Sequence, residues 1–426
     1  MRPQKKKLID ANQDWFHQLE RKRTNGPTLS NSEKSHQGTS TISVHSGQYD
    51  DPISGAIGTP IYQNSTFYLS EPVYQGIHEG RGRDEMIYSR YGNPSQWAVQ
   101  NKIAALENAE SSIVFSSGMA AISSAILALM EKGGHLITSR DIYGGSYNLI
   151  YEDLIKFGME VSFVDMTNLQ EIEEAIKENT QLLFFETLTN PLLKLLDVEK
   201  VIQLGKKHQL RVILDNTFLT PYNLKPLDLG ADVVVNSATK YLNGHSDLIA
   251  GTASSSRKLM DRIWVQMLKS GGSLDPHACF MLERGLKTFA IRMKAHNANS
   301  LELAEYLYAH PMTLSVTHPG LPNFEMKDIA DQLLTKGHSG MITFVVKGGD
   351  ENAHRLLEAL HIPKQATSLG GVESLISLPY NSSQASLTRK QRHAIGIEDG
   401  TIRLSVGIED IEDLINDFEQ ALTKLK

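Results

Sequence analysis

The sequence predicts a two-domain α/β protein in which a mainly parallel sheet, covered by helices on both faces, precedes a smaller α+β domain. Its 426 residues exceed one ordinary core of roughly 100 to 200 residues, which favours two domains. Short apolar runs alternate with helical segments from Ser112 onward, and this alternation ends near residue 290. Both observations indicate that one extended sheet dominates the first part of the chain.

The strands of the larger domain are predicted from runs that contain almost no polar alternation. Such runs are typical of strands whose two faces are both covered. They are Ile113–Phe115, Leu136–Thr138, Val161–Val164, Leu182–Phe185, Val212–Leu214 and Val233–Val235. In the smaller domain we expect strands over Gly340–Val346 and Thr401–Val406, and a final helix whose apolar residues recur at helical spacing from Ile411 to Leu425.

The composition favours a small-molecule function inside a reducing compartment. The formal charge of −7 argues against general affinity for nucleic acid phosphates. The single cysteine, Cys279, has no intrachain partner, and no apolar stretch that resembles a signal-peptide core follows the lysines at 5–7. The apolar segment Met119–Met130 is shorter than the roughly 20 residues that cross a bilayer, so we expect a buried helix there. We therefore expect a cytoplasmic protein without membrane or nucleic acid partners.

Residues 1–41 are expected to form an appended tail. They are polar and end in a run of Thr, Asn, Ser, Gly and Gln. Such a composition buries too little apolar surface to offset the entropy of ordering, which predicts disorder.

Chemically active residues follow five of the predicted strands. In open parallel sheets, ligands bind beyond the carboxyl ends of the strands. The polar segments at these ends are 116–119, 141–147, 186–190, 215–217 and 236–240. We expect them to share one site.

The segment Ser117-Gly118-Met119 opens the predicted buried helix. Free amides and the positive end of a helix dipole bind anions such as phosphate. Serine is also a preferred helix cap, and this segment alone is better explained as an ordinary cap. The polar segments at the neighbouring strand ends reverse that order and favour anion binding.

Asp215 and Lys240 supply the charged groups of the expected site. Asp215 directly follows a predicted strand, where a buried carboxylate needs a cationic partner such as a pyridinium nitrogen; the alternative is a turn cap. Lys240 ends the segment Ser237-Ala-Thr239-Lys240, whose hydroxyls can bind phosphate while the amine forms a Schiff base with an aldehyde. An isolated lysine is usually on the surface, but this lysine follows a strand of the same sheet.

Other cofactors find no support in the sequence. Neither the dinucleotide fingerprint nor the Walker A pattern occurs. The histidines are scattered, and no two of them lie at the spacing of paired metal ligands. We therefore predict no metal.

Taken together, these residues resemble the Cys/Met-metabolism family of pyridoxal-phosphate enzymes, which includes cystathionine β- and γ-lyases, cystathionine γ-synthase and methionine γ-lyase. The resemblance runs from about Thr41 to the C-terminus. It is carried by Tyr88-Ser-Arg90-Tyr-Gly-Asn-Pro94, Ser116-Ser-Gly-Met119, Tyr143-Gly-Gly145, Glu186-Thr-Leu-Thr-Asn-Pro191, Asp215-Asn-Thr-Phe218, Ser237-Ala-Thr-Lys-Tyr241, Ser368-Leu-Gly-Gly371 and Thr401-Ile-Arg-Leu-Ser405.

The resemblance implies a fold and a domain organisation. The fold is that of the pyridoxal-phosphate-dependent transferases, the aspartate aminotransferase type or fold type I, with a mainly parallel seven-stranded sheet. The implied parts are a tail (1–41), an arm that contacts a neighbouring subunit (42–87), a cofactor-binding domain (88–289) and a C-terminal domain (290–426).

The resemblance also implies the roles of the site residues. Lys240 carries pyridoxal 5′-phosphate covalently, Asp215 pairs with its ring nitrogen, and Tyr143 stacks on the ring and takes part in catalysis. The remaining cofactor contacts would come from Ser117, Gly118, Met119, Asn190, Thr217, Ser237 and Thr239. Tyr88 and Arg90 would reach the phosphate from a neighbouring subunit, which implies a dimer and, as in many relatives, a tetramer. Local loop contacts for Tyr88 and Arg90, and plain packing for Tyr143, are the alternatives.

By the same resemblance, Arg403 clamps the substrate carboxylate and Ser368 helps to place it. A planar guanidinium that donates two parallel hydrogen bonds suits this task. The alternatives are a salt bridge within the small domain for Arg403 and a turn residue for Ser368.

Three positions bear on the reaction. Thr367 and Asn148 stand where cystathionine enzymes acting at the γ-carbon often carry Glu and Arg, and Gly145 stands where methionine γ-lyases typically carry Cys. We therefore predict a carbon–sulfur lyase that acts on cystathionine, with β-elimination preferred over γ-elimination. The alternatives are γ-replacement by a cystathionine γ-synthase or an O-acyl-homoserine sulfhydrylase, methionine γ-lyase activity, and a non-catalytic regulator. The first forty residues hold no helix-turn-helix pattern to support a regulator.

Overall fold

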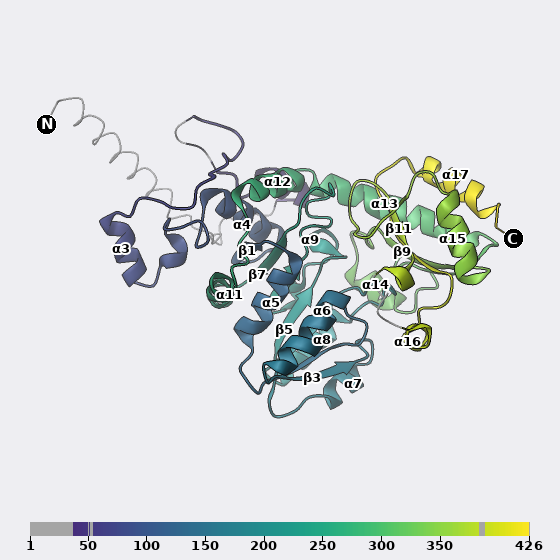
Figure 1. Ribbon diagram of the computed structural model, residues 1–426, viewed down its shortest axis with the longest axis horizontal. Coiled ribbons are helices and arrows are strands. Elements are labelled where there is room, and N and C mark those ends of the chain that lie inside the picture. Colours follow the sequence, from purple (N-terminus) through teal and green to yellow (C-terminus); the bar gives the residue numbers. More distant parts are fainter. Residues whose placement is uncertain (1–36, 50, 52–53, 383–387, 426) are drawn as a thin grey trace.

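The computed structural model describes residues 37–49, 51, 54–382 and 388–425. In Figure 1 the chain runs from an N-terminal arm at one end, through a large central domain, to a smaller domain that carries the C-terminus at the other end. The prediction for residues 1–41 falls mostly outside the described residues. The predicted boundaries at 87/88 and 289/290 stay predictions.

The central domain contains a seven-stranded sheet of order β1-β7-β6-β5-β4-β2-β3. Its strands are β1 (Ser111–Phe115), β2 (His135–Ser139), β3 (Glu160–Val164), β4 (Thr180–Glu186), β5 (Arg211–Asp215), β6 (Val233–Asn236) and β7 (Gly251–Ser255). The six predicted runs form β1 to β6. Only β7 runs antiparallel to its neighbours, and its sequence, Gly-Thr-Ala-Ser-Ser, has no apolar run that could have predicted it.

Helices cover both faces of this sheet, as the apolar runs predicted. In β4, Leu182 and Phe184 pack into one core while Leu183 and Phe185 pack into the other. The first core includes α5 (Gly118–Leu129) and α11 (Arg257–Ser270), and the second includes α4 (Pro94–Glu107), α8 (Val198–Lys207) and α12 (Pro276–Leu286). The predicted buried helix at Met119–Met130 is α5.

The second domain is built on a five-stranded sheet of order β10-β11-β12-β9-β8. Its strands are β8 (Thr313–Thr317), β9 (Met341–Val346), β10 (Lys364–Gln365), β11 (Leu375–Ser377) and β12 (Thr401–Ser405). It packs against α13 (Phe289–Ala309), α15 (Gly349–Ala359) and α17 (Ile411–Leu422). The two predicted strands and the final helix are confirmed. Because α13 contributes Met293 to the core of the first domain and Leu303 to that of the second, it joins the domains.

The arm contains α2 (Thr39–His45), α3 (Glu71–His78) and η1 (Gly82–Asp84), and α3 lies far from the second domain in Figure 1. The buried amine of Lys102 donates to the carbonyls of Ser43 and Val44, which ties α2 to α4. The shorter helices are α6 (Gly144–Asn148), η2 (Leu149–Leu154), α7 (Leu169–Glu174), α9 (Thr220–Asn223), α10 (Pro226–Leu229), α14 (Lys327–Leu333), η3 (Pro379–Asn381) and α16 (Arg389–Ala394). Within the described ranges, no helix combines the length and apolar character needed to span a bilayer.

Candidate active site

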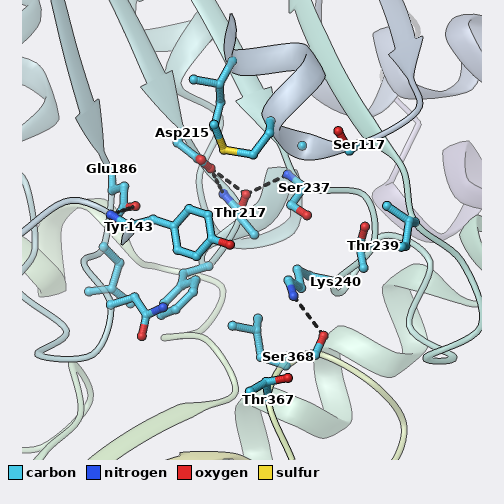
Figure 2. A pocket seen from close by; sticks show the side chains of 18 of the residues that line it. Ser117, Tyr143, Glu186, Asp215, Thr217, Ser237, Thr239, Lys240, Thr367 and Ser368 are labelled. Atoms are coloured by element: carbon cyan, nitrogen blue, oxygen red, sulfur yellow. Dashed lines mark hydrogen bonds between the residues drawn. The ribbon is translucent and has the colours of Figure 1, made fainter. Parts of the chain in front are cut away.

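A cavity of about 520 Å³ lies beyond the carboxyl ends of β4, β5 and β6, where the two domains meet. Twelve predicted site residues line it: Ser117, Gly118, Met119, Tyr143, Asn190, Asp215, Thr217, Ser237, Thr239, Lys240, Ser368 and Arg403. Its other lining residues are Ile122, Glu186, Leu188, Phe218, Ile249, Thr367, Leu369 and Ser382. Figure 2 shows how several of these side chains converge.

The start of α5 forms one end of the cavity. Ser117 caps the helix, and its hydroxyl accepts from the Ala120 amide at 3.1 Å. Helix amides of the first turn lack partners within the helix, so Gly118 and Met119 can offer theirs to an anion. A Cβ on Gly118 would lie 2.9 Å from that of Ser237, so the glycine permits this close approach. Capping and anion binding are therefore compatible.

Lys240 lies near the middle of the cavity, and its amine donates to the Ser368 hydroxyl at 2.9 Å. Burial, followed by the positive charge of Arg403, lowers the pKa of the amine to about 8. Ser368 adopts a φ of +80°, a left-handed conformation that is costly for a residue other than glycine. The small domain thus directs a strained serine at the lysine.

Asp215 ends β5 and is connected to the lysine segment through Thr217. The amide and hydroxyl of Thr217 both donate to Asp215 Oδ1, at 3.0 and 2.5 Å, and the hydroxyl accepts from the Ser237 amide at 2.8 Å. Burial raises the pKa of the Asp215 carboxyl. A cation placed against this carboxyl would restore its negative charge.

Arg403 lies on β12 and points into the cavity from the small domain. Its guanidinium donates to Asn190 Oδ1 at 3.3 Å and to the Ser368 carbonyl at 2.9 Å. Burial lowers its pKa to about 10, and among the described residues no ion pair includes it. The salt bridge considered as its alternative role is therefore absent from this part of the chain. A buried, unpaired guanidinium favours an anionic ligand.

Tyr143 lies beside the cavity, and its amide donates to Glu186 Oε1 at 2.9 Å. A Cβ on Gly145 would lie 2.6 Å from a ring carbon of Tyr143, so a larger residue at this position would displace the ring from where it lies. Glu186 was not predicted as a site residue, although it lies in one of the quoted motifs. The signal that could have found it is an acid at a strand end next to that of Asp215.

Tyr88 and Arg90 do not reach the Lys240 cavity of the same chain. They line a separate cavity of about 400 Å³ with Gln63, Asn64, Ser65, Ser89, Gln96 and residues 273–276. The Arg90 guanidinium donates to the Leu268 carbonyl at 2.7 Å. Their predicted contribution to the site of a neighbouring subunit stays a prediction.

The Lys240 cavity fits pyridoxal phosphate. A carboxyl lies at one side, a lysine amine with a lowered pKa lies centrally, and a helix start with flanking hydroxyls can hold a phosphate. Its volume suits a cofactor together with a small substrate. Among the described residues, no group of three or more His, Cys, Asp and Glu side chains could hold a metal ion.

The chain is similar along most of its length to known lyases of sulfur amino acids. An L-methionine gamma-lyase of Fusobacterium nucleatum subsp. polymorphum is 41% identical over 391 residues, covering 91% of this chain and 98% of the relative. A cystathionine beta-lyase of Lactococcus lactis subsp. cremoris is 42% identical over 383 residues, covering 89% and 98%. The solved structure of a cystathionine gamma-lyase from Lactobacillus plantarum, complexed with L-serine, has a TM-score of 0.85 at 37% identity and covers 91% of this chain and 99% of its own.

The match to a family places the chain more generally. The family described as "Cys/Met metabolism PLP-dependent enzyme" matches residues 40–423. The predicted resemblance, the fold class and the dependence on pyridoxal phosphate are therefore confirmed. This chain belongs to the Cys/Met-metabolism family of pyridoxal-phosphate-dependent enzymes.

Proposed function

We propose that this enzyme is a carbon–sulfur lyase that carries pyridoxal phosphate on Lys240 and acts on cystathionine, with cleavage at the β-carbon preferred. The observation that carries the proposal is the placement of the Lys240 amine between two groups of opposite character. Asp215 lies on its cofactor side, and the buried, unpaired Arg403 lies on the side of the small domain. The proposal places the enzyme in cytoplasmic methionine and cysteine metabolism.

In this proposal the cofactor is held at three points. Lys240 would hold its aldehyde and Asp215 its ring nitrogen, and the start of α5 would hold its phosphate together with the Ser237 and Thr239 hydroxyls. Thr217, Asn190 and Tyr143 flank the ring. When bound, pyridoxal phosphate accepts the electron pair released at the substrate Cα.

The protein residues orient the substrate and move its proton. Arg403 binds the α-carboxylate through its guanidinium, and Ser368 positions both Arg403 and the lysine through its carbonyl and hydroxyl. The Lys240 amine, when not bound to the cofactor, would act as the base that removes the proton from the substrate Cα. A pKa of about 8 leaves a substantial neutral fraction near physiological pH, which a general base requires.

The proposal includes self-association. Tyr88 and Arg90 lie in a separate polar cavity, where they are available to another copy of the chain. In the proposed dimer, each subunit supplies these two side chains to the phosphate in its partner, and dimers pair into a tetramer.

The distal wall of the cavity supports a second candidate, γ-elimination from methionine. Ile249, Thr367, Leu369 and Ser382 carry no charge, and Asn148 does not line the cavity. The four ionisable lining residues of acidic or basic type, Glu186, Asp215, Lys240 and Arg403, are all assigned to the cofactor or the α-carboxylate rather than to this wall. The distal amino and carboxylate groups of cystathionine therefore find no charged partner on this wall. The uncharged methyl thioether of methionine needs none.

The released keto acid tests the proposal. We expect pyruvate and homocysteine from cystathionine, because loss of the thiol from the β-carbon leaves a three-carbon product. The holoenzyme should be incubated separately with cystathionine, methionine, and an O-acyl-homoserine with a thiol, and the keto acids separated by chromatography. Only 2-oxobutyrate from cystathionine would contradict β-elimination, and preferential turnover of methionine would establish the second candidate. Absence of keto acid from every substrate would refute a lyase.

The lowered pKa of Lys240 predicts how the rate at which the cofactor-free enzyme binds pyridoxal phosphate depends on pH. Only the neutral amine attacks the aldehyde, so the rate should rise about tenfold per pH unit below pH 8 and level off above it. Stopped-flow absorbance measures this rate, with N-α-acetyl-lysine as the control because its ordinary pKa keeps its rate rising to about pH 10. If the rate of the enzyme also rises without a plateau up to about pH 10, burial does not lower the pKa of Lys240.

A further inference from the structure

We propose that Glu186 is a positioning residue that acts as an uncharged carboxylic acid, holding the Tyr143 backbone at the cavity and leaving Asp215 as the ionised acid there. This inference rests on the proposed function, because it assumes that Tyr143 and Asp215 both serve the bound cofactor. Glu186 itself is not proposed to transfer a proton to the substrate.

The sheet places the two acids side by side. Glu186 and Asp215 are paired in the parallel register of β4 and β5. Alternate residues of a strand share a face, and Phe184 and Ile213, two residues earlier, both pack into the core beneath α5. Glu186 and Asp215 therefore point to the same side of the sheet, which Figure 2 shows for the two labelled side chains.

The surroundings of Glu186 disfavour a negative charge. The side chain is 6% exposed, and its Oε2 atom is buried without a hydrogen-bond partner. The pKa of Glu186 is raised well above its ordinary value, mainly by burial and then by the negative charge of Asp215. Hydrogen bonds from the Tyr143 and Asn190 amides act in the opposite direction. Asp141 adds further negative charge, although it pairs with Lys194. Ionising two neighbouring buried acids together costs free energy, because the two negative charges repel each other. The proposed cationic ring nitrogen would lie against Asp215, so Asp215 is the acid that ionises and Glu186 stays protonated.

The consequence concerns Tyr143. Its amide donates to Glu186 Oε1, and the residue directly precedes the short helix α6, after a turn that follows β2. On the other side, Gly145 leaves just enough space for the ring. The hydrogen bond to Glu186 therefore sets where the backbone of Tyr143 lies, and with it the position of the ring over the cavity.

Amide exchange and infrared spectroscopy on the holoenzyme test this inference. Glu186→Leu removes the acceptor, so exchange of the Tyr143 amide should accelerate about tenfold in a peptide covering residues 141–148. Glu186→Gln keeps a neutral acceptor of the same shape, so exchange should stay within about threefold of the original enzyme. The infrared difference between the original enzyme and Glu186→Gln should contain the carbonyl band of a protonated acid. Glu160→Gln, which changes an exposed acid at the start of β3, is the control: it should leave the exchange unchanged, and its infrared difference should contain a carboxylate band without the band of a protonated acid.

Either of two results would overturn the inference: a carboxylate band in the infrared difference, or exchange in Glu186→Gln as fast as in Glu186→Leu. If Glu186→Leu does not fold, the infrared difference between the original enzyme and Glu186→Gln still shows whether Glu186 is protonated. Neither measurement requires turnover. A protein that failed as a lyase could therefore still confirm or refute the state of Glu186.

Discussion

Replacing Lys240 with alanine is expected to lower kcat/KM for the preferred substrate by at least about 10⁴-fold. The variant loses both the covalent attachment of the cofactor and the base that removes the α-proton, and general-base catalysis alone contributes up to about 10⁴-fold. The visible absorbance of the lysine-bound cofactor should disappear at the same time. Steady-state release of keto acid and an absorbance spectrum of the purified variant measure both effects.

Two further variants make this result specific. Lys240→Arg keeps a positive charge but lacks a neutral amine, so it should lose as much activity as the alanine variant. Lys200→Ala, in the first turn of α8, removes an exposed lysine that pairs with Asp197 and should retain activity and colour. Full colour in Lys240→Ala would mean that another residue carries the cofactor.

Replacing Asp215 with asparagine is expected to lower kcat about 10³-fold. A buried ion pair that loses one partner is destabilised by about 3 to 5 kcal/mol, and the neutral amide no longer stabilises a positive charge on the cofactor ring nitrogen. The geometry should survive, because the asparagine oxygen can still accept from the Thr217 amide and hydroxyl. Steady-state kinetics and pyridoxal phosphate titration of the cofactor-free variant measure the loss of rate and of affinity.

Asp232→Asn is the matched control for this prediction. Asp232 directly precedes β6, where it pairs with Arg211 at the start of β5 and accepts from the Val212 amide at 2.9 Å. It belongs to the same sheet but lies at the edge opposite the cavity, so its replacement should leave kcat within about twofold. Equal losses in both variants would point to destabilisation of the sheet rather than to the cofactor.

Much of the larger domain was predictable because its strands are buried on both faces. Runs such as Leu182–Phe185 contain no polar residue, and few other structures accommodate that pattern. The location of the site followed from the same fact, since parallel strands bring their carboxyl ends to one edge. Asp215 and Lys240 could therefore be assigned to one cavity although 24 intervening residues separate them.

Other features carried no local signal. β7 consists of small residues, and its position between β1 and β6 is seen only in the folded sheet. The pairing of Glu186 with Asp215 depends on the register of β4 against β5, which no single segment encodes. For this reason Glu186 was predicted only as part of the segment 186–190 and received no role of its own in the site.

The sequence by itself determined the family and the cofactor, and it predicted most of the residues that line the Lys240 cavity, because each strand and the polar segment after it are encoded locally. Only the tertiary structure decided how distant segments meet. It brings Ser368 of the small domain to the Lys240 amine, directs the unpaired Arg403 into the same cavity, and keeps Tyr88 and Arg90 out of it. The physical reason is that these contacts arise from the packing of two domains, which depends on complementary surfaces formed by many residues rather than on any short pattern.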